Sequence, residues 1–248
     1  MGSRKLQQWI GVWTLSLTAS CGVALGQSPS ADMTGTYRGK DARAWTALLD
    51  HENEHVRRQA AYALGRIGSP AQIAVPALIK TLKDPRLESR WYALDTLGRI
   101  GPAAEAAVPA MLAALQDPAN DDVVRRTAAR SLGRMGPAAQ AAIPELAKAL
   151  RSEDPRLRVA AAGALWSITN KDEALKFLYR FLAGDDHDAA YEAATALLEI
   201  HPDAELPLEP LVAALGHPSP DVRRATTKVL QKIGPRTLVP LVAALRTN

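Results

Sequence analysis

The segment 51–55, His-Glu-Asn-Glu-His, has the residue types and spacing most suggestive of chemistry in this chain of 248 residues. In zinc proteases, two histidines one helical turn apart bind the metal while a glutamate activates its water. Such a site requires a helix, and the repeat pattern places this segment in a break between two helices. Arg58 and Ala61 also stand where the longer zinc motif has glycine and histidine. We therefore predict a solvated polar turn, with a weak metal site shared with Glu88 as the alternative.

Other catalytic patterns are missing from the sequence. His187, His201 and His217 fall in separate turns, and the single cysteine, Cys21, cannot form a CxxC pair. There is no Ser/His/Asp arrangement at family spacing and no phosphate-binding glycine loop, because the glycines recur as helix stops. We predict no catalytic residues, no metal ligands and no cofactor.

A phrase close to Leu-Gly-x-(Ile/Met)-Gly recurs about every 33 residues and organises the chain. Its last position is occupied by Gly68, Gly101, Gly136, Thr169, His201 and Gly234. A period of this size is typical of units that cannot bury their apolar face alone and therefore stack on their neighbours. The sequence thus predicts an elongated array instead of one globular core.

Each unit contains the signals of two helices separated by a short break. A proline suits the first turn of the first helix, as at Pro76, Pro109 and Pro144. An Asp-Pro or His-Pro pair then ends that helix, and a second helix, such as that from Val56, carries apolar residues at 3.6 spacing. The terminal glycine supplies a left-handed stop. We predict an all-α fold, an α-solenoid of six helix pairs closed by a half repeat over 236–248.

The phrases VPxLxxxLxDP and VRRxAAxALGxIG resemble the HEAT repeat family, in its short bacterial form named after phycobilisome-lyase HEAT-like repeats. The resemblance covers residues 44–248, whereas the ankyrin and tetratricopeptide signatures are absent. It implies that the second helices line the concave side of a superhelix. It also implies that a column of arginines bonds with the turn aspartates of adjacent repeats. The column consists of Arg57, Arg90, Arg125, Arg158 and Arg223.

The N-terminus differs in kind from the repeats. Two basic residues precede an uncharged apolar stretch that ends in small residues, as in a secretory signal peptide. We predict a signal peptide over 1–26, a linker over 27–43 and a HEAT-like repeat domain over 44–248. The mature protein is then exported to the periplasm or the extracellular space, without a membrane span, and lipid anchoring through Cys21 is the alternative.

Composition limits the classes of partner. The formal net charge is +4, and it falls by two when the leader is removed with its two basic residues. A nucleic-acid-binding domain is usually strongly basic, so we expect no nucleic-acid partner. With 47% hydrophobic and 5% aromatic residues, the chain is suited to a continuous core of alanine and leucine.

Aromatic and arginine side chains recur on the side of the second helices that faces away from the predicted core. Trp, Tyr and Arg are the residue types most enriched at binding hot spots. The candidates for protein binding are Arg58, Tyr62, Trp91, Arg126, Arg130, Trp166, Tyr191 and Arg224. The alternative is that the aromatic residues among them pack between helices as ordinary core.

These observations favour an exported scaffold, not an enzyme, whose concave face binds another protein through an extended or helical segment of acidic or aromatic character. The alternative is an enzyme or enzyme subunit of the HEAT-like class, similar to phycobilin lyases or to metal-dependent hydroxylases. Those hydroxylases hold two metals with several His-Glu pairs, whereas this chain has one such pair.

Overall fold

The computed structural model describes residues 35–199 and 206–237, which belong to one compact unit, Ala31–Asn248. The regular structure of these residues is helical, apart from an isolated bridge between Tyr37 and Lys40. None of their helices is long and apolar enough to cross a membrane. Several predicted features lie outside the described residues: the signal peptide over 1–26, Cys21, the repeat end at His201 and the closing helix with Leu238, Leu241 and Leu245.

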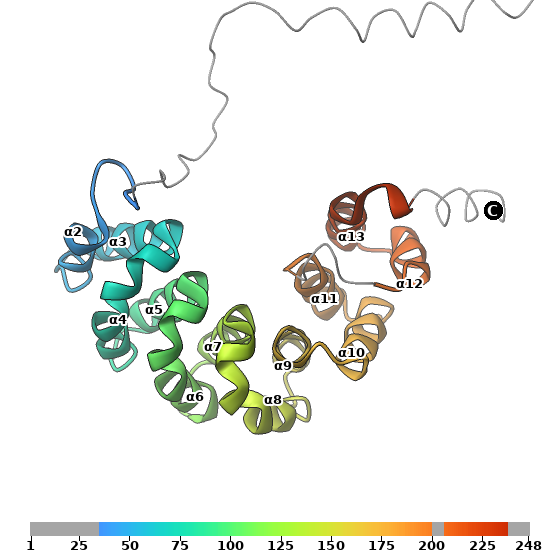
Figure 1. Ribbon diagram of the computed structural model, residues 1–248. Coiled ribbons are helices and arrows are strands. Elements are labelled where there is room, and N and C mark those ends of the chain that lie inside the picture. Colours follow the sequence, from blue (N-terminus) through green and yellow to red (C-terminus); the bar gives the residue numbers. More distant parts are fainter. Residues whose placement is uncertain (1–34, 200–205, 238–248) are drawn as a thin grey trace, which may run out of the picture. The chain divides into compact units, whose positions relative to one another are not determined.

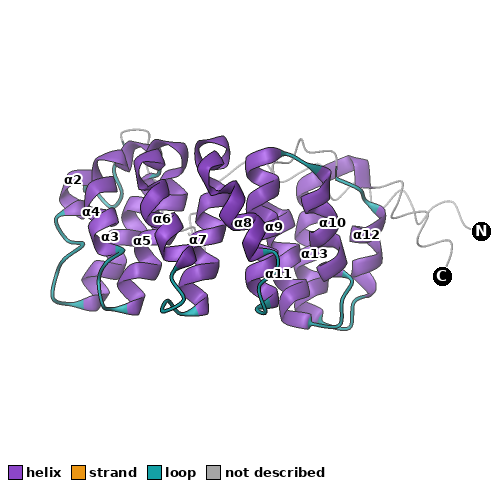
Figure 2. Ribbon diagram, turned by 90° about the horizontal axis from the view of Figure 1, so that it is seen from below, coloured by secondary structure: helices purple, strands orange, loops and turns teal. Residues whose placement is uncertain are grey.

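The helices of this unit pair along an arc (Figure 1). The first helices of the pairs are α2 (Ala42–Thr46), α4 (Val75–Thr81), α6 (Val108–Gln116), α8 (Ile143–Ala149), α10 (Asp172–Leu182) and α12 (Glu209–Ala213). The second helices are α3 (Glu54–Ile67), α5 (Leu87–Ile100), α7 (Asp122–Arg134), α9 (Pro155–Thr169), α11 (His187–Glu199) and α13 (Pro220–Ile233). The second helices line the inner side of the arc, and Figure 2 shows the helices side by side with nearly parallel axes. The prediction of an all-α solenoid is confirmed.

The prolines and glycines that the sequence predicts at helix ends are found there in the structure. Pro76, Pro109 and Pro144 occupy the first turn of α4, α6 and α8, where the missing N–H costs no helical bond. Gly68 follows α3 with a φ of 71°, and its counterparts in the repeats also have positive φ, which glycine adopts without steric cost. After α9, the left-handed conformation falls instead on Asn170, with a φ of 53°.

Short 3-10 segments join the inner to the outer row, and the sequence did not predict them. They are η1 (Ser69–Ala74), η2 (Gly101–Ala107) and η3 (Gly136–Ala142), and each contacts the next. Each has proline in its first turn and mainly small residues after it, which suits this tight helix in short pieces. The chain passes from α9 to α10 without such a segment, so this stack of connections ends at η3.

Alanine and leucine fill the core between the two rows, and the buried residues form two clusters that share α9. Leu157, Ala161 and Ala164 belong to the cluster that also includes α3 to α8. Val159 and Trp166 belong to the cluster that also includes α10 to α13. Opposite sides of α9 therefore stabilise different parts of the array.

Glycine allows consecutive second helices to approach closely. A Cβ atom added at Gly98 would lie 2.8 Å from the Cα atom of Ser131, and one at Gly133 would lie 2.7 Å from the Cα atom of Ala164. Side-chain carbons do not pack at such distances from backbone atoms, because protein interiors are already close-packed. These glycines thus set the spacing of α5, α7 and α9.

The arginine column has a different role from the one that the resemblance implies. The Arg57 guanidinium donates to the backbone carbonyls of His51 and Glu52, both at 2.8 Å. The same pairing joins Arg158 to Ser152 and Glu153, and Arg223 to His217 and Pro218. The expectation of bonds to turn aspartates of adjacent repeats is therefore wrong for these three arginines. They bind backbone carbonyls of the turn that precedes their own helix, and they thereby hold the two helices of one repeat together.

The folded array begins before the predicted linker ends at residue 43. The Tyr37 side chain is only 4% exposed, and the Trp45 indole donates to the Tyr37 carbonyl at 3.1 Å. Asp41 caps α2 by accepting from the Ala44 amide. Polar and glycine-rich composition concealed this boundary, because one tyrosine is enough to anchor the segment on the first helix pair.

Candidate functional site

The predicted protein-binding residues all lie on second helices, but the structure places them in different surroundings. Arg58 and Tyr62 lie on α3, Trp91 on α5, Arg126 and Arg130 on α7, Trp166 on α9, Tyr191 on α11 and Arg224 on α13. The first three line one cavity, Arg130 and Trp166 line a second, and Tyr191 and Arg224 line a third. The single stripe expected from the sequence is thus divided.

An aromatic cavity of about 530 Å³ lies against α3 and α5. We call it the N-terminal groove, and we define it by Tyr37, Arg38, Arg58, Tyr62, Trp91 and Tyr92. The Tyr37 and Tyr62 rings meet edge to face with centroids 6.0 Å apart, and Trp91 meets Tyr92 at 4.8 Å. Such pairs hold each ring in place. Tyr62 is nevertheless 46% exposed, so the groove offers an ordered aromatic surface.

The N-terminal groove has an excess of positive charge. The Arg58 guanidinium bonds to the Nδ1 atom of His55 at 3.0 Å, and that of Arg38 lies 5.7 Å from the Tyr37 ring centroid. Neither arginine pairs with a carboxylate among the described residues. Asp95 also lines the groove, but it already accepts from Arg99 at 2.7 Å. A ligand carrying a carboxylate would therefore complement the groove.

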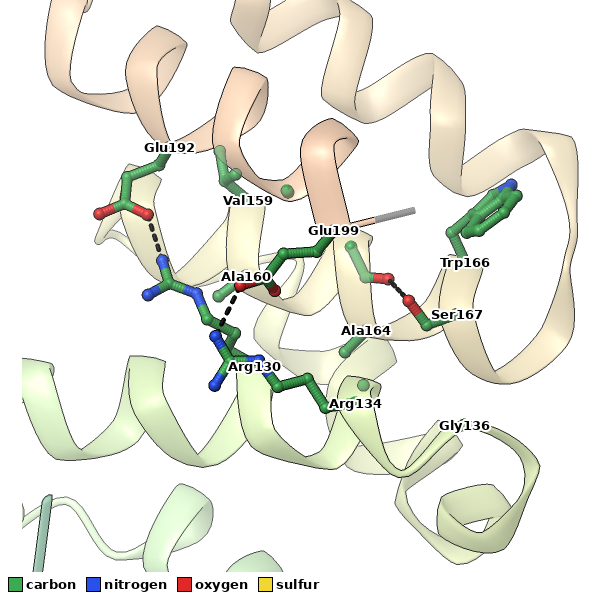
Figure 3. Close-up of a pocket in the computed structure, with 13 residues that line it drawn as sticks. Arg130, Arg134, Gly136, Val159, Ala160, Ala164, Trp166, Ser167, Glu192 and Glu199 are labelled. Carbon is green, nitrogen blue, oxygen red and sulfur yellow. Dashed lines mark hydrogen bonds and ion pairs between the residues drawn. The ribbon is translucent and has the colours of Figure 1, made fainter. Parts of the chain in front are cut away.

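Ion pairs connect α7 to α11 across α9 (Figure 3). Arg130 pairs with Glu192, and Arg134 pairs with Glu199 at 2.6 Å. Arg134 also donates to Asp95 of α5 at 2.7 Å. We call these five residues the ion-pair clasp. It borders a cavity of about 320 Å³ and links second helices that are two repeats apart.

The sequence of α9 allows the clasp to form. In the columns that carry Arg58 and Tyr62 on α3, α9 carries Val159 and Gly163. Neither side chain is long enough to stand between α7 and α11. At these positions α9 therefore presents only short side chains on its inner surface. Arg130 and Arg134 of α7 can reach Glu192 and Glu199 of α11 across it (Figure 3).

Burial and ion pairing shift the pKa values of two clasp residues. Burial raises the pKa of Asp95, but hydrogen bonds from Arg99 and Arg134 outweigh this effect and hold the pKa below its ordinary value. Burial lowers the pKa of Arg134, but the neighbouring Glu199 and Asp95 outweigh it and raise the pKa. Both groups are therefore charged at neutral pH, and the charged forms stabilise the folded array.

Two of the predicted binding residues, Trp166 and Arg126, already make contacts with other parts of the fold. Trp166 is only 8% exposed and packs in the cluster of α10 to α13, so the expected outward position is wrong for this residue. It replaces the glycine found in this column at Gly98 and Gly133, where the column faces the next second helix. Arg126 donates to the Asp122 carbonyl at 3.2 Å and lies 3.9 Å from the Asp154 carboxylate.

A third cavity, of about 460 Å³, lies between α11 and α13. Tyr191 is 45% exposed there, and Arg224 pairs with Asp221 at 3.4 Å. Asp188 and Lys228 also line it. This cavity, the C-terminal groove, therefore has mixed charge and one exposed tyrosine ring. The N-terminal groove combines several rings with Arg38 and Arg58, which pair with no carboxylate in the part of the chain that the structure describes.

The prediction of a polar turn holds for residues 51–53, whereas Glu54 and His55 already belong to the first turn of α3, and His51 has a structural partner. Its Nδ1 atom accepts from the Asn53 amide at 3.0 Å, and α3 begins only at Glu54. The same position holds an aspartate in most repeats, and each accepts from the amide two residues later: Asp84, Asp117, Asp154 and Asp186, with His217 as a second histidine. His51 thus replaces a turn aspartate. In the described ranges, no three His, Cys, Asp or Glu side chains gather as metal ligands would.

Several residues of these sites were missed by the sequence analysis. Tyr37 and Tyr92 complete the N-terminal groove although neither lies in the predicted columns. The available signal was their closeness in sequence to Trp45, Tyr62 and Trp91, since all five aromatic residues fall within residues 37–92. Glu192 and Glu199 gave no such signal, because charged residues on a helix surface are usually solvated.

The described helices thus define an α-solenoid whose candidate sites lie on its second helices. Models of HEAT repeats match residues 42–123 and 119–199. The matched segments cover more than half of the chain, which therefore belongs to the HEAT repeat family.

Two solved structures show the same fold. The complex of CpcE and CpcF of phycocyanin lyase from Nostoc sp. PCC7120 is 24% identical, with 76% of this chain and 80% of that chain covered and a TM-score of 0.54. The YibA protein of Escherichia coli is 18% identical, with 84% and 87% covered and a TM-score of 0.50. No curated protein matches the chain.

The low pKa of Asp95 predicts a pH-dependent contribution to stability. We expect Asp95→Asn to lower the free energy of unfolding by about 1–2 kcal/mol at pH 7, because two charge-assisted bonds are weakened. The difference from the wild type should be full above the unfolded-state pKa of about 3.9. It should close as pH falls through the lower folded-state pKa, since the wild type then loses the same charge.

Urea unfolding of both proteins between pH 3 and pH 7 measures this difference. Asp50→Asn is the control, because the Asp50 side chain is mostly exposed and its nearest cation lies 3.9 Å away. We expect its effect to stay within about 0.5 kcal/mol. A difference between wild type and Asp95→Asn that did not change with pH would contradict the role of the Asp95 charge.

Proposed function

We propose that this protein is a non-enzymatic interaction scaffold that binds a segment of another protein on the inner side of its array. The observation that carries the proposal is the N-terminal groove, where the exposed ring of Tyr62 and the partly buried ring of Trp91 lie beside Arg58. Aromatic and arginine side chains in a concave site are the residue types that dominate binding energy. None of these three residues is fully buried in the core.

The size of the N-terminal groove supports a peptide-like ligand. A cavity of about 530 Å³ lies within the range of ordinary ligand sites and accommodates a few side chains of a partner. The rings would contact an apolar or aromatic side chain, and Arg38 and Arg58 would pair with adjacent carboxylates. We therefore propose an extended or helical segment in which an aromatic or aliphatic residue is flanked by acidic residues.

The groove predicts which peptides the protein selects. In a random peptide display on the purified chain, we expect enrichment of sequences with an aromatic or aliphatic residue next to Asp or Glu. Tyr62→Ala combined with Trp91→Ala should weaken binding of a selected peptide at least 10-fold, because each truncation removes a ring contact worth about 1–2 kcal/mol.

Phe177→Ala is the matched control, because Phe177 is an exposed aromatic residue of the outer helix α10. It should leave peptide affinity unchanged, and circular dichroism should show the same helicity in all variants. Equal affinity of the wild type and the Tyr62→Ala/Trp91→Ala variant would reject the N-terminal groove as the binding site.

We also propose that the scaffold acts outside the cytoplasm, on the basis of the signal-like sequence over 1–26. The full chain expressed in a bacterial host should appear in the periplasmic or secreted fraction, and its N-terminal sequence should begin at Gln27. A lipid-modified Cys21 at the N-terminus would support the alternative of a membrane-anchored scaffold. An unprocessed chain in the cytoplasmic fraction would contradict export.

A further inference from the structure

The ion-pair clasp is an unusual contact for a repeat array, because it skips one repeat. Arg130 and Glu192 are 62 residues apart in sequence, and Arg134 and Glu199 are 65 residues apart. In a solenoid each repeat normally contacts only its neighbours. Here the side chains of α7 and α11 meet above α9 (Figure 3), so the clasp restrains the bend of the array at α9.

The two arginines remain suited to anions when their glutamates are removed. Among the described residues, Glu192 is the ion-pair partner of Arg130, and Glu199 shares Arg134 with Asp95. The Arg130 side chain is 35% exposed and the Arg134 side chain is 25% exposed, so a ligand can reach both from the adjoining cavity. Partly exposed ion pairs contribute little net stability, and one carboxylate can therefore replace another.

The spacing of the two glutamates indicates how far apart the acidic groups of a competing ligand must lie. Glu192 and Glu199 lie seven residues apart on α11, which is two helical turns or about 10.5 Å along the axis. A partner helix with two acidic residues at the same spacing presents the same pair of carboxylates. Arginine suits this exchange because its guanidinium binds carboxylates with defined geometry.

The opposite side of α9 shows what opening the clasp would change. A cavity of about 710 Å³ is lined by Leu150 after α8, Leu165 of α9 and Phe177 of α10. It lies where the chain passes from α9 to α10 without a 3-10 segment. A bend that brings α7 toward α11 separates α8 from α10, so release of the clasp would allow these apolar side chains to approach each other.

We infer that Arg130 and Arg134 form a binding site for two carboxylates of an acidic partner helix, and that Glu192 and Glu199 occupy this site in the free protein. The acidic helix exchanges with the two glutamates, and α11 then moves away from α7. This site is separate from the N-terminal groove, and the inference does not depend on peptide binding there.

The test uses the full chain and a labelled alanine-based helical peptide with two glutamates seven residues apart. Its control has glutamine at both positions. We expect Glu192→Gln/Glu199→Gln to bind the acidic peptide at least 10-fold more tightly than the wild type, because the internal competitor is removed. Arg130→Gln/Arg134→Gln should lose this binding. The Tyr62→Ala/Trp91→Ala variant should bind the acidic peptide as the wild type does.

Small-angle X-ray scattering measures the opening. The radius of gyration of Glu192→Gln/Glu199→Gln should exceed that of the wild type at low salt. Glu153→Gln/Glu173→Gln, which changes two exposed acidic residues outside the clasp, should resemble the wild type in affinity and in radius. The exchanged pair Arg130→Glu/Glu192→Arg should keep the wild-type radius but bind the acidic peptide more weakly, which separates the ligand site from a purely structural role.

Two outcomes would overturn the inference. Equal affinity of the wild type and Glu192→Gln/Glu199→Gln for the acidic peptide would show that the glutamates do not compete with a ligand. An unchanged radius of gyration in that variant, with helicity preserved by circular dichroism, would show that the clasp does not restrain the array.

Discussion

Close contact between consecutive second helices is the constraint on which the rest of the structure depends. At Gly98 and Gly133 the next helix backbone occupies the space of a side chain, so α5, α7 and α9 stack without a gap. Residues one turn earlier on each helix then point to the inner surface of the arc. The close stacking also brings Tyr62 and Trp91, which are 29 positions apart, to one cavity with three arginines.

The array departs from this regular contact at α9. Trp166 stands where Gly98 and Gly133 stand in earlier repeats, and its buried indole packs in the core cluster of α10 to α13. The same helix has Val159 and Gly163 on its inner side and lacks a 3-10 connection to α10. A few substitutions in one repeat therefore alter the packing, the bend and the inner surface together. The ion-pair clasp forms at this point because Val159 and Gly163 leave no long side chain between α7 and α11.

The repeat period, the helix pairs and their prolines and glycines could be predicted from the sequence, because each is a local signal that recurs in every copy. The turn role of His51 followed from the same alignment. The 3-10 segments could not be predicted, since short alanine-rich stretches after proline suit several conformations. The burial of Trp166 and the pairing of Arg130 with Glu192 depend on the distance between helices, and no single repeat encodes that distance. The N-terminal groove was only half predicted, because Tyr37 lies in a stretch with the composition of a linker.

The close helix contact is tested most directly by comparing alanine at two glycines of one column. Gly133→Ala places its Cβ against the backbone of Ala164, whereas Gly65→Ala meets only the flexible side chain of Arg99. In urea unfolding of the full chain, we expect Gly133→Ala to lower the free energy of unfolding by about 1–3 kcal/mol. Gly65→Ala should be neutral or stabilising by up to about 1 kcal/mol, because alanine favours the helix. Equal stabilisation by both substitutions would contradict the account.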